Sequence, residues 1–368
     1  MIQTIGWVGV GILVIAIPLY VLHTARQQKN IRNKNEWDVL HFIHRHSNKA
    51  SLYMTNNNKV IAASSENQWM PVATITPILI AIEYANQVTK GFVDPNKSVS
   101  LADVELYHIP HVDQGAHHAW VEKCRQKKRK TMYSDNVQLH DVVEGMLYHQ
   151  SHANTAFLLN LLNINQLNQQ LAHLHLDHHE DFFYFTAAPL LPAYLHVEES
   201  LSTRKIKQKL QEMPQQDFNA YCGIIHGLLT HRSAGRLIEQ HAQMNMDEDI
   251  KQLITHKLPR STTEEYANIL NKLYYEKEFD EHKEVLTGMT ASGYWTYIGD
   301  GKTSTSRTNN HVIHGAPTDE NNHYVLCVFM NNVTTSESSW INENIEDFLA
   351  KTLTDNTFQE EVIATLST

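Results

Sequence analysis

Residues 70–91 read MPVATITPILIAIEYANQVTKG, and this stretch decides the expected fold. Its apolar side chains recur at helical spacing: Ile75, Ile78, Leu79, Ile82 and Ala85. Gly91 then supplies a common helix stop. A helix that is apolar on most of its sides belongs in a core. We therefore expect a central helix here, with the remaining elements packed around it.

The start of this helix carries a family resemblance. Pro-Val-Ala at 71–73 precedes Thr74, and Pro77 follows three residues later. The phrase resembles the P-x-A-S-x-x-K opening of the central helix in class A β-lactamases and related penicillin-binding serine hydrolases. Thr74 stands at the serine position and Pro77 at the lysine position. Acylation by a hydroxyl needs a neighbouring proton acceptor, which proline lacks. We expect Thr74 to cap the helix and Pro77 to lie in its first turn.

The second motif of the family, S-x-N, is also altered. A literal SDN stands at 134–136, but the family's triplet follows a helix and precedes a phrase like ANTAFLL, found here at 153–159. We expect a helix at 137–147. Aligning this helix and the phrase at 153–159 with the family pattern places the motif at Gln150, Ser151 and His152. By this resemblance, the hydroxyl and amide that the motif supplies to the active-site cleft are lost.

The third motif, K-T-G, is the best preserved. Lys302, Thr303 and Ser304 follow Gly-Asp-Gly at 299–301 and precede an apolar strand at 324–330. In the family this motif lends a cation and backbone donors to the substrate. Ser304 in place of glycine would crowd a bound substrate. Lys302 is therefore either a remnant of a binding site or an ordinary turn lysine.

The resemblance implies an α/β fold of the α+β sandwich type, the β-lactamase/transpeptidase-like fold. It has a central antiparallel sheet flanked by helices and an all-helical lobe, here at about 92–255. A helix at 36–46 and a hairpin with strands at 50–55 and 60–63 precede the central helix, which is the family's order. Further helices are expected at 165–176, 218–231, 244–256 and 338–351, and Thr262 with Glu265 fits a capping box. We expect this domain to span 36–352, with a tail at 353–368.

The beginning of the chain predicts a membrane anchor. Residues 5–22 are uncharged and apolar, near the lower length limit for a membrane span, with Trp7 and Tyr20 placed like interfacial anchors. A cleaved signal peptide is the weaker alternative, since no basic residue precedes the apolar run. We expect a single-pass anchor at 1–25 in a bacterial cytoplasmic membrane and a polar tether at 26–35.

The side of the membrane that holds the domain is open. Arg26, Lys29, Arg32 and Lys34 follow the span, so the positive-inside rule favours the cytoplasm. The resemblance favours the extracytoplasmic side, because that family works outside the membrane. Three cysteines, at 124, 222 and 327, form no closed disulfide set and suit either side.

Charge and histidine content suggest no cofactor. A formal charge of -10 argues against broad nucleic-acid binding. The 24 histidines include a cluster at 173–179, but none shows the spacing of a zinc motif, so no metal site is expected. A cationic run at 123–130 predicts a solvated loop, or else a site for lipid headgroups or an acidic partner. The residues of that anionic-partner patch are Lys127, Lys128, Arg129 and Lys130.

Together these features predict a membrane-anchored, β-lactamase-like pseudoenzyme. Members of a catalytic unit act together, so losing the nucleophile, its lysine and the second motif removes most of the rate. The fold would then serve as a binding or scaffold component of a membrane assembly, with a membrane protein as its partner. The alternative is a serine/threonine hydrolase or transpeptidase-like protein of the cell envelope that is active through Thr74, with Lys302 or His152 as base, or that binds a ligand without chemistry.

Overall fold

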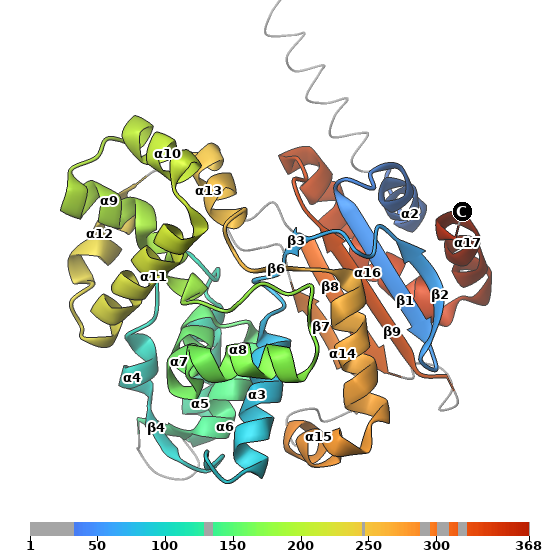
Figure 1. The fold of residues 1–368 in the computed structure, drawn as a ribbon, viewed down its shortest axis with the longest axis horizontal. Coiled ribbons are helices and arrows are strands. Elements are labelled where there is room, and N and C mark those ends of the chain that lie inside the picture. Colours follow the sequence, from blue (N-terminus) through green and yellow to red (C-terminus); the bar gives the residue numbers. More distant parts are fainter. Residues whose placement is uncertain are drawn as a thin grey trace, which may run out of the picture.

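The computed structural model describes residues 33–128, 135–244, 247–287, 295–299, 309–315 and 322–367. Figure 1 shows a sheet with helices on both of its faces, beside a large group of helices. The strands are β1 (Ala50–Asn56), β2 (Lys59–Ser64), β3 (Met70–Pro71), β4 (Ser98–Ser100), β5 (Asn136–Gln138), β6 (Arg260–Ser261), β7 (Trp295–Gly299), β8 (Asn309–Gly315) and β9 (Tyr324–Met330). The expected mixed α/β architecture with a helix-flanked antiparallel sheet is confirmed.

The helices that cover the sheet come from both ends of the sequence. They are α2 (Glu36–Arg45), α14 (Thr263–Tyr275), α16 (Thr335–Thr354) and α17 (Asn356–Leu366). After α14, the short turn η2 (Lys277–Phe279) leads into α15 (Asp280–Thr287), which packs on the central helix. The separate helical group contains α3 (Pro77–Thr89), α4 (Leu101–Glu105), α5 (Ala116–Lys128), α6 (Leu139–His149), α7 (His152–Leu162), α8 (Ile164–His173), η1 (Phe185–Leu190), α9 (Leu191–Glu199), α10 (Thr203–Glu212), α11 (Gln215–Thr230), α12 (Gly235–Gln243) and α13 (Glu248–Thr255).

The main sheet has the order β2-β1-β9-β8-β7, and every neighbouring pair is antiparallel. The β1–β2 hairpin matches the sequence prediction. Asn57 and Asn58 form its turn with φ angles of 48° and 60°. Asparagine tolerates this left-handed backbone better than most residues, and such turns match the twist of a hairpin.

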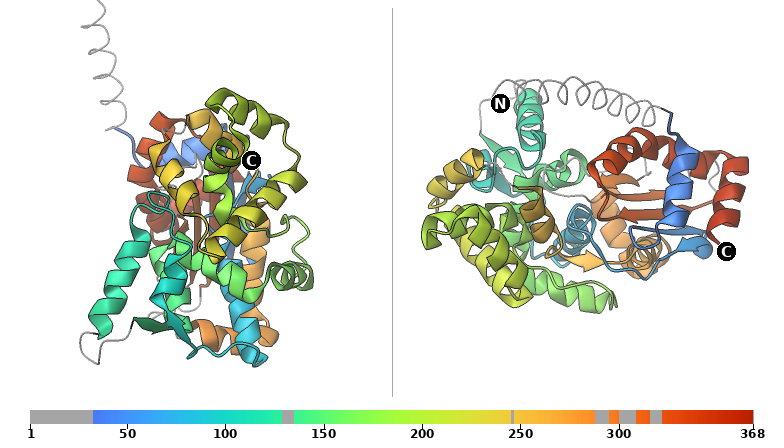
Figure 2. Two further views of the ribbon diagram at one scale, coloured as in Figure 1. Left: turned by 90° about the vertical axis from the view of Figure 1, so that its left-hand side faces the viewer. Right: turned by 90° about the horizontal axis from the view of Figure 1, so that it is seen from above.

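Alternation along the central strands divides the core in two. On β9, Tyr324, Leu326, Val328 and Met330 face one hydrophobic cluster, while Val325, Cys327 and Phe329 face the other. Successive side chains of a strand point to opposite faces, so a fully apolar strand must be covered on both sides. Figure 2 shows the sheet enclosed accordingly, with α2, α16 and α17 on the face opposite the helical group.

Helix α17 lies within the segment expected as a tail. Its side chains Phe358, Val362 and Leu366 are buried in the same cluster as those of α2 and α16. Trp37 of α2 contacts the Phe358 ring edge-on at 4.8 Å between centroids. The packed domain therefore extends to Leu366.

Helix α14 is fixed to the opposite face of the sheet by buried polar contacts. Ser51 Oγ and Thr263 Oγ1 lie 2.6 Å apart, and Asn271 Nδ2 donates to Thr55 Oγ1 at 3.1 Å. The expected cap is half formed. Thr262 accepts from the Glu265 backbone N–H at 3.2 Å, whereas the Glu265 carboxylate turns to His178. Because these contacts fix one side of α14 against the sheet, its opposite, polar side faces away from the sheet.

The central helix starts later than predicted. Met70–Pro71, which lies before the expected cap at Thr74, is strand β3 and pairs with Arg260–Ser261 in β6. Helix α3 begins at Pro77, and almost all of its residues are buried against α6, α7, α8 and α15. The prediction of a buried helix with Pro77 in its first turn is therefore confirmed, and the helix starts two residues later than a cap at Thr74 predicts.

The prediction of a loop in the cationic run is wrong. Ala116–Lys128 is helix α5, and Trp120, Val121 and Cys124 are buried on one of its faces. Lys123 and Lys127 donate to Glu144 of α6, at 2.6 and 3.0 Å. Their charges are matched across a helix pair, which allows a strongly cationic segment to remain helical.

The predicted membrane segment, residues 5–22, lies outside the described residues, as do the whole anchor at 1–25 and most of the tether. Among the helices that the structure describes, none combines the length and the apolar character needed to cross a membrane.

Candidate functional site

Thr74 lies in the turn before α3, where the resemblance places a nucleophile. Asn310 of β8 is fully buried, and its Nδ2 donates to Pro71 O at 2.8 Å and to Thr74 Oγ1 at 3.3 Å. The N-cap position belongs to Thr76, whose Oγ1 donates to Ala73 O at 2.8 Å. The prediction that Thr74 caps the helix is therefore wrong, because Pro77 takes the first helical position and sets the start there.

Two described neighbours of Thr74 are Asn310 and Pro77. Its contact with Asn310 is with an amide N–H₂ group, which donates a hydrogen bond and takes no proton. Pro77 occupies the position from which a lysine amine would reach the hydroxyl, as expected for the first turn of the helix.

The segment aligned with the second motif joins two helices. Gln150 ends α6 in a left-handed conformation with φ of 56°, and Ser151 caps α7. Ser151 is fully buried, and its Oγ donates to Asn154 Oδ1 at 2.7 Å. The backbone N–H of His152 donates to Asp113 Oδ2 at 3.3 Å. Burial lowers the pKa of His152 to about 4, so its ring is neutral near pH 7.

A chain of polar groups continues from Ser151. His117 Nδ1 lies 3.1 Å from Ser151 Oγ, and His117 Nε2 lies 2.7 Å from Glu105 Oε2. The order serine, histidine, carboxylate resembles a catalytic triad, but a nucleophile must reach a substrate and Ser151 has no exposed surface. Asp113 ties the same region together by accepting the backbone N–H groups of His117 and His152. This arrangement positions α5 and α7.

Sequence reasoning missed the role of Asp113. The sequence shows only which histidines are neighbours along the chain. In the structure, Glu105 of α4, His117 of α5 and His152 at the α6–α7 junction lie close to one another and to Asp113. His108 stacks on His117 with 5.0 Å between ring centroids, and burial together with His117 lowers the pKa of His108.

The remaining predicted site residues lie partly outside the described structure. Lys302, Thr303 and Ser304 are among the residues that are not described, and so are Arg129 and Lys130. Lys127 contacts Glu144 and, at 3.5 Å, Asp141. Hydrogen bonds to Glu144 raise the pKa of Lys127 against the opposing effect of burial. Lys128 ends α5.

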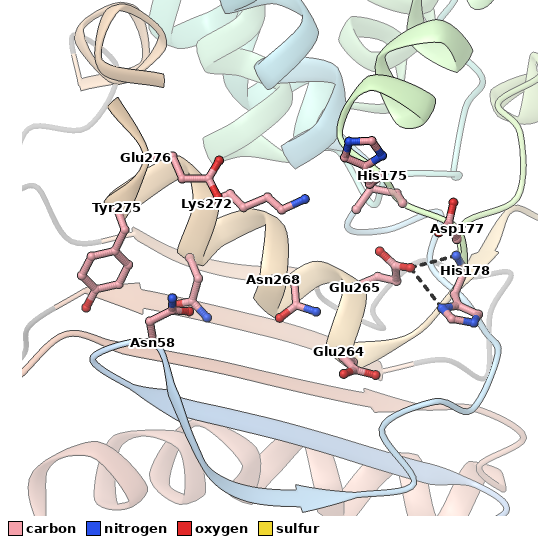
Figure 3. Close-up of a pocket in the computed structure, with 12 residues that line it drawn as sticks. Asn58, His175, Asp177, His178, Glu264, Glu265, Asn268, Lys272, Tyr275 and Glu276 are labelled. Atoms are coloured by element: carbon pink, nitrogen blue, oxygen red, sulfur yellow. Dashed lines mark hydrogen bonds and ion pairs between the residues drawn. The ribbon is translucent and has the colours of Figure 1, made fainter. Parts of the chain in front are cut away.

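A polar pocket of about 430 Å³ opens on the outward face of α14 (Figure 3). Its walls come from α14, from the segment after α8 and from the β1–β2 turn. The lining residues are Asn58, His175, Leu176, Asp177, His178, Glu264, Glu265, Asn268, Asn271, Lys272, Tyr275 and Glu276. No pattern in the sequence predicts this pocket, because its polar positions look like the solvent face of an amphipathic helix.

Two contacts fix the pocket's shape. Glu265 Oε1 accepts the His178 backbone N–H at 2.8 Å and lies 3.1 Å from His178 Nδ1. Lys272 Nζ donates to Leu174 O at 2.7 Å. The histidines at 175 and 178 belong to the cluster for which no metal site was expected. Within the described residues, no three His, Cys, Asp or Glu side chains are placed to hold a metal ion.

Comparisons with known proteins give structural likeness only. No family model and no curated protein matches the chain. The chain is similar to solved class A β-lactamases. A β-lactamase from Chitinophaga pinensis is 12% identical, with 84% of this chain and 95% of that chain covered and a TM-score of 0.49. A class A β-lactamase from Bacteroides cellulosilyticus is also 12% identical, with 88% and 100% covered and a TM-score of 0.48.

A penicillin-binding protein gives a similar result. A PBP-A variant, solved as an acyl-enzyme complex with penicillin G, is 11% identical, with 88% of this chain and 96% of that chain covered and a TM-score of 0.48. At these identities and scores the likeness assigns no activity to this chain.

Proposed function

We propose that this chain is a β-lactamase-like pseudoenzyme, anchored in a bacterial membrane by residues 5–22, that serves as a binding or scaffold component of a membrane assembly. One observation carries the proposal. Thr74 is held by the Asn310 amide, and Pro77 begins α3 where a lysine base would stand. Because proline stands at position 77, Thr74 lacks the lysine that the resembling family uses for acyl transfer, and this supports a structural role for it.

Burial at the second motif supports the same proposal. Ser151 is bonded to Asn154 and His117, and it caps α7. A hydroxyl used in this way offers no group to a substrate in a cleft. The proposal therefore treats both hydroxyls, Thr74 and Ser151, as parts of the frame that hold the starts of α3 and α7.

Labelling with a fluorescent penicillin tests the loss of chemistry. The full chain in mild detergent is incubated with the probe. Bound fluorescence is then detected on a denaturing gel, and the mass of the intact chain is measured by mass spectrometry. We expect no adduct, while an active class A β-lactamase that is trapped in parallel carries one. An adduct on the wild-type chain that disappears in Thr74→Ala would overturn the pseudoenzyme and establish the hydrolase or transpeptidase alternative.

Co-purification tests the scaffold role. We expect a membrane protein to remain with the full chain after cross-linking, and the yield to fall when Arg129 and Lys130 are changed to glutamine. The matched control is Arg204→Gln with Lys205→Gln, two exposed cationic positions at the start of α10. Equal loss in both variants would show a general charge effect and contradict the patch, since exposed charges act over a Debye length.

A further inference from the structure

The ring of His117 lies inside the helical group and has a partner at each of its two nitrogens. The side chain is fully buried. Its Nδ1 lies 3.1 Å from Ser151 Oγ at the start of α7, and its Nε2 lies 2.7 Å from Glu105 Oε2 at the end of α4. Both distances are those of hydrogen bonds, in which each ring nitrogen either donates or accepts. The partners decide which.

The direction of the hydrogen bond to Ser151 is fixed by Asn154. Asn154 Nδ2 donates to the Val142 carbonyl at 2.9 Å, and a carbonyl can only accept. The amide atom that faces Ser151, at 2.7 Å, is therefore Oδ1, and it accepts the single proton of the Ser151 hydroxyl. Because that proton is used, Ser151 Oγ can only accept from the histidine ring. His117 Nδ1 therefore carries a hydrogen.

The contact with Glu105 requires a second proton on the same ring. A ring with its only hydrogen on Nδ1 would turn a lone pair of Nε2 toward the carboxylate, and at 2.7 Å two lone pairs repel. One proton must therefore lie between the two atoms. The Glu105 side chain is 54% exposed, and a carboxyl group in water loses its proton at a pH about two units lower than an imidazole does. The proton thus belongs to His117, whose ring is an imidazolium ion.

The groups around the ring are consistent with this charge. The titratable groups that face it are Glu105 and His108 from α4 and the loop after it, Asp113 and His118 around the start of α5, and His152 at the start of α7. On α6, the carboxylates of Asp141 and Glu144 are paired with Lys123 and Lys127.

Of the two carboxylates near the ring, Glu105 is the one that pairs with it. The oxygens of Asp113 are taken by backbone N–H groups, those of Gly115, His117 and His152. His108 stacks on the His117 ring with 5.0 Å between centroids, and burial, followed by the charge on His117, lowers the pKa of His108. The stacked neighbour is therefore neutral near pH 7, and Glu105 alone balances the charge of the ring at its Nε2 side.

We propose that His117 and Glu105 form a pH-sensitive latch, which ties α4 to α5 and to the α6–α7 junction only while the ring is charged. When the ring loses its second proton, Nε2 presents a lone pair to the carboxylate, and Glu105 turns into the water that it already contacts. The hydrogen bond from Nδ1 to Ser151 persists, because it uses the other proton. Release is therefore confined to α4 and the loop that joins it to α5. The inference does not depend on the proposed loss of catalysis.

Nitrogen NMR of the full chain, labelled with ¹⁵N-histidine and held in mild detergent at pH 7, tests the charge. We expect two protonated ring nitrogens for His117 in the wild type. In Glu105→Gln we expect only Nδ1 to be protonated, because a glutamine amide can donate to a neutral Nε2. The His117 signals are those that disappear in His117→Asn or, where that variant does not fold, those that change in Ser151→Ala. A wild-type ring with one protonated nitrogen overturns the proposal, and so does a Glu105→Gln ring with two.

Hydrogen–deuterium exchange of the full chain tests the latch. Peptides that cover residues 101–115 are followed at pH 6 and pH 9, with rates corrected for the intrinsic effect of pH on exchange. We expect the corrected rate in the wild type to be several-fold higher at pH 9, because α4 is released. Glu105→Gln should show equal corrected rates, since its amide bonds to the ring in either state.

Glu122→Gln is the matched control, because it removes the same charge from the exposed face of α5. We expect it to respond to pH as the wild type does. Corrected rates that are equal at the two pH values in the wild type contradict the latch. A Glu122→Gln variant that loses the pH response as fully as Glu105→Gln shows an effect of net charge and contradicts it as well.

Discussion

At the residue scale, Gly145 is the tightest point of the helical group. An added Cβ would lie 2.1 Å from Asn154 Nδ2 and 2.7 Å from Trp120 Cδ1. Neither neighbour is free to move, since Asn154 Nδ2 donates to Val142 O and Trp120 Nε1 donates to Asp141 O. The contact of α5, α6 and α7 therefore depends on the absence of a side chain at this position.

We expect Gly145→Ala to lower the free energy of unfolding by about 1–3 kcal/mol, the usual cost of overpacking a core. Gly223→Ala is the control, because nothing lies within 4 Å of its added Cβ and alanine favours a helix by about 1 kcal/mol over glycine. Urea unfolding followed by circular dichroism should show shifts of opposite sign. Equal shifts would refute the packing at Gly145.

Also at this scale, His226 is a neutral buried histidine. It stacks on Tyr184 with 3.9 Å between ring centroids, and burial lowers its pKa to about 4. In the unfolded chain the histidine pKa is about 6.5, so the unfolded chain takes up the proton first as pH falls. Stability is therefore complete above about pH 6.5 and decreases as pH falls toward 4.

We expect His226→Gln to flatten this loss of stability between pH 6.5 and 4, by an amount on the order of 1–3 kcal/mol at the acid end. Glutamine keeps an N–H donor for Asn160, which now faces His226 Nε2 at 3.3 Å. His44→Gln, on the exposed face of α2, is the comparison. The test is the melting temperature of each variant across this pH range. If the melting temperature of His226→Gln falls with pH as steeply as that of the wild type, His226 is not a cause of the acid destabilisation.

At the element scale, α16 starts with a complete capping box. Thr334 Oγ1 accepts the Glu337 backbone N–H at 3.2 Å, and Glu337 Oε2 accepts the Thr334 N–H at 2.7 Å. Lys49 Nζ, which lies just before β1, also reaches Glu337 at 2.9 Å. The cap therefore links the last long helix to the start of the sheet.

We expect Thr334→Ala to cost about 1 kcal/mol of unfolding free energy, because it leaves helix N–H groups without an acceptor. Thr335→Ala changes the neighbouring exposed threonine, which does not cap the helix, and should shift the chemical denaturation midpoint very little. A Thr335→Ala effect as large as that of Thr334→Ala would argue against the cap as the cause.

At the scale of the whole molecule, local patterns predicted those elements that depend on local physics. The hairpin followed from β-type residues around an asparagine turn, and α3 from a run of apolar residues. The cap of α3 was misplaced by two residues, at Thr74 instead of Thr76, because Pro77 takes the first helical position. The pairing of Met70 with Ser261 is a contact that no local pattern reveals. Helix α5 was missed because its lysines are matched by Glu144 on another helix.

The candidate site was less predictable than the fold. The motif positions are assigned from the sequence by resemblance, and the contacts of these residues depend on distant partners such as Asn310 for Thr74 and His117 for Ser151. The pocket beside α14 could not be found, because Asn58, Asp177 and Glu264 lie in separate segments and each looks like ordinary surface.

The pairing of β1 with β9 has a consequence for biosynthesis. β1 is translated long before its neighbour in the sheet, β9, because the whole helical group lies between them in the sequence. Until then β1 has only β2 beside it, and the apolar residues on both of its faces await α14, α16 and α17. Long-range strand pairing is slow and leaves unpaired edges exposed, whereas the intervening helices contact one another locally. The nascent chain should therefore depend on chaperones to protect its first hairpin while the helical group forms.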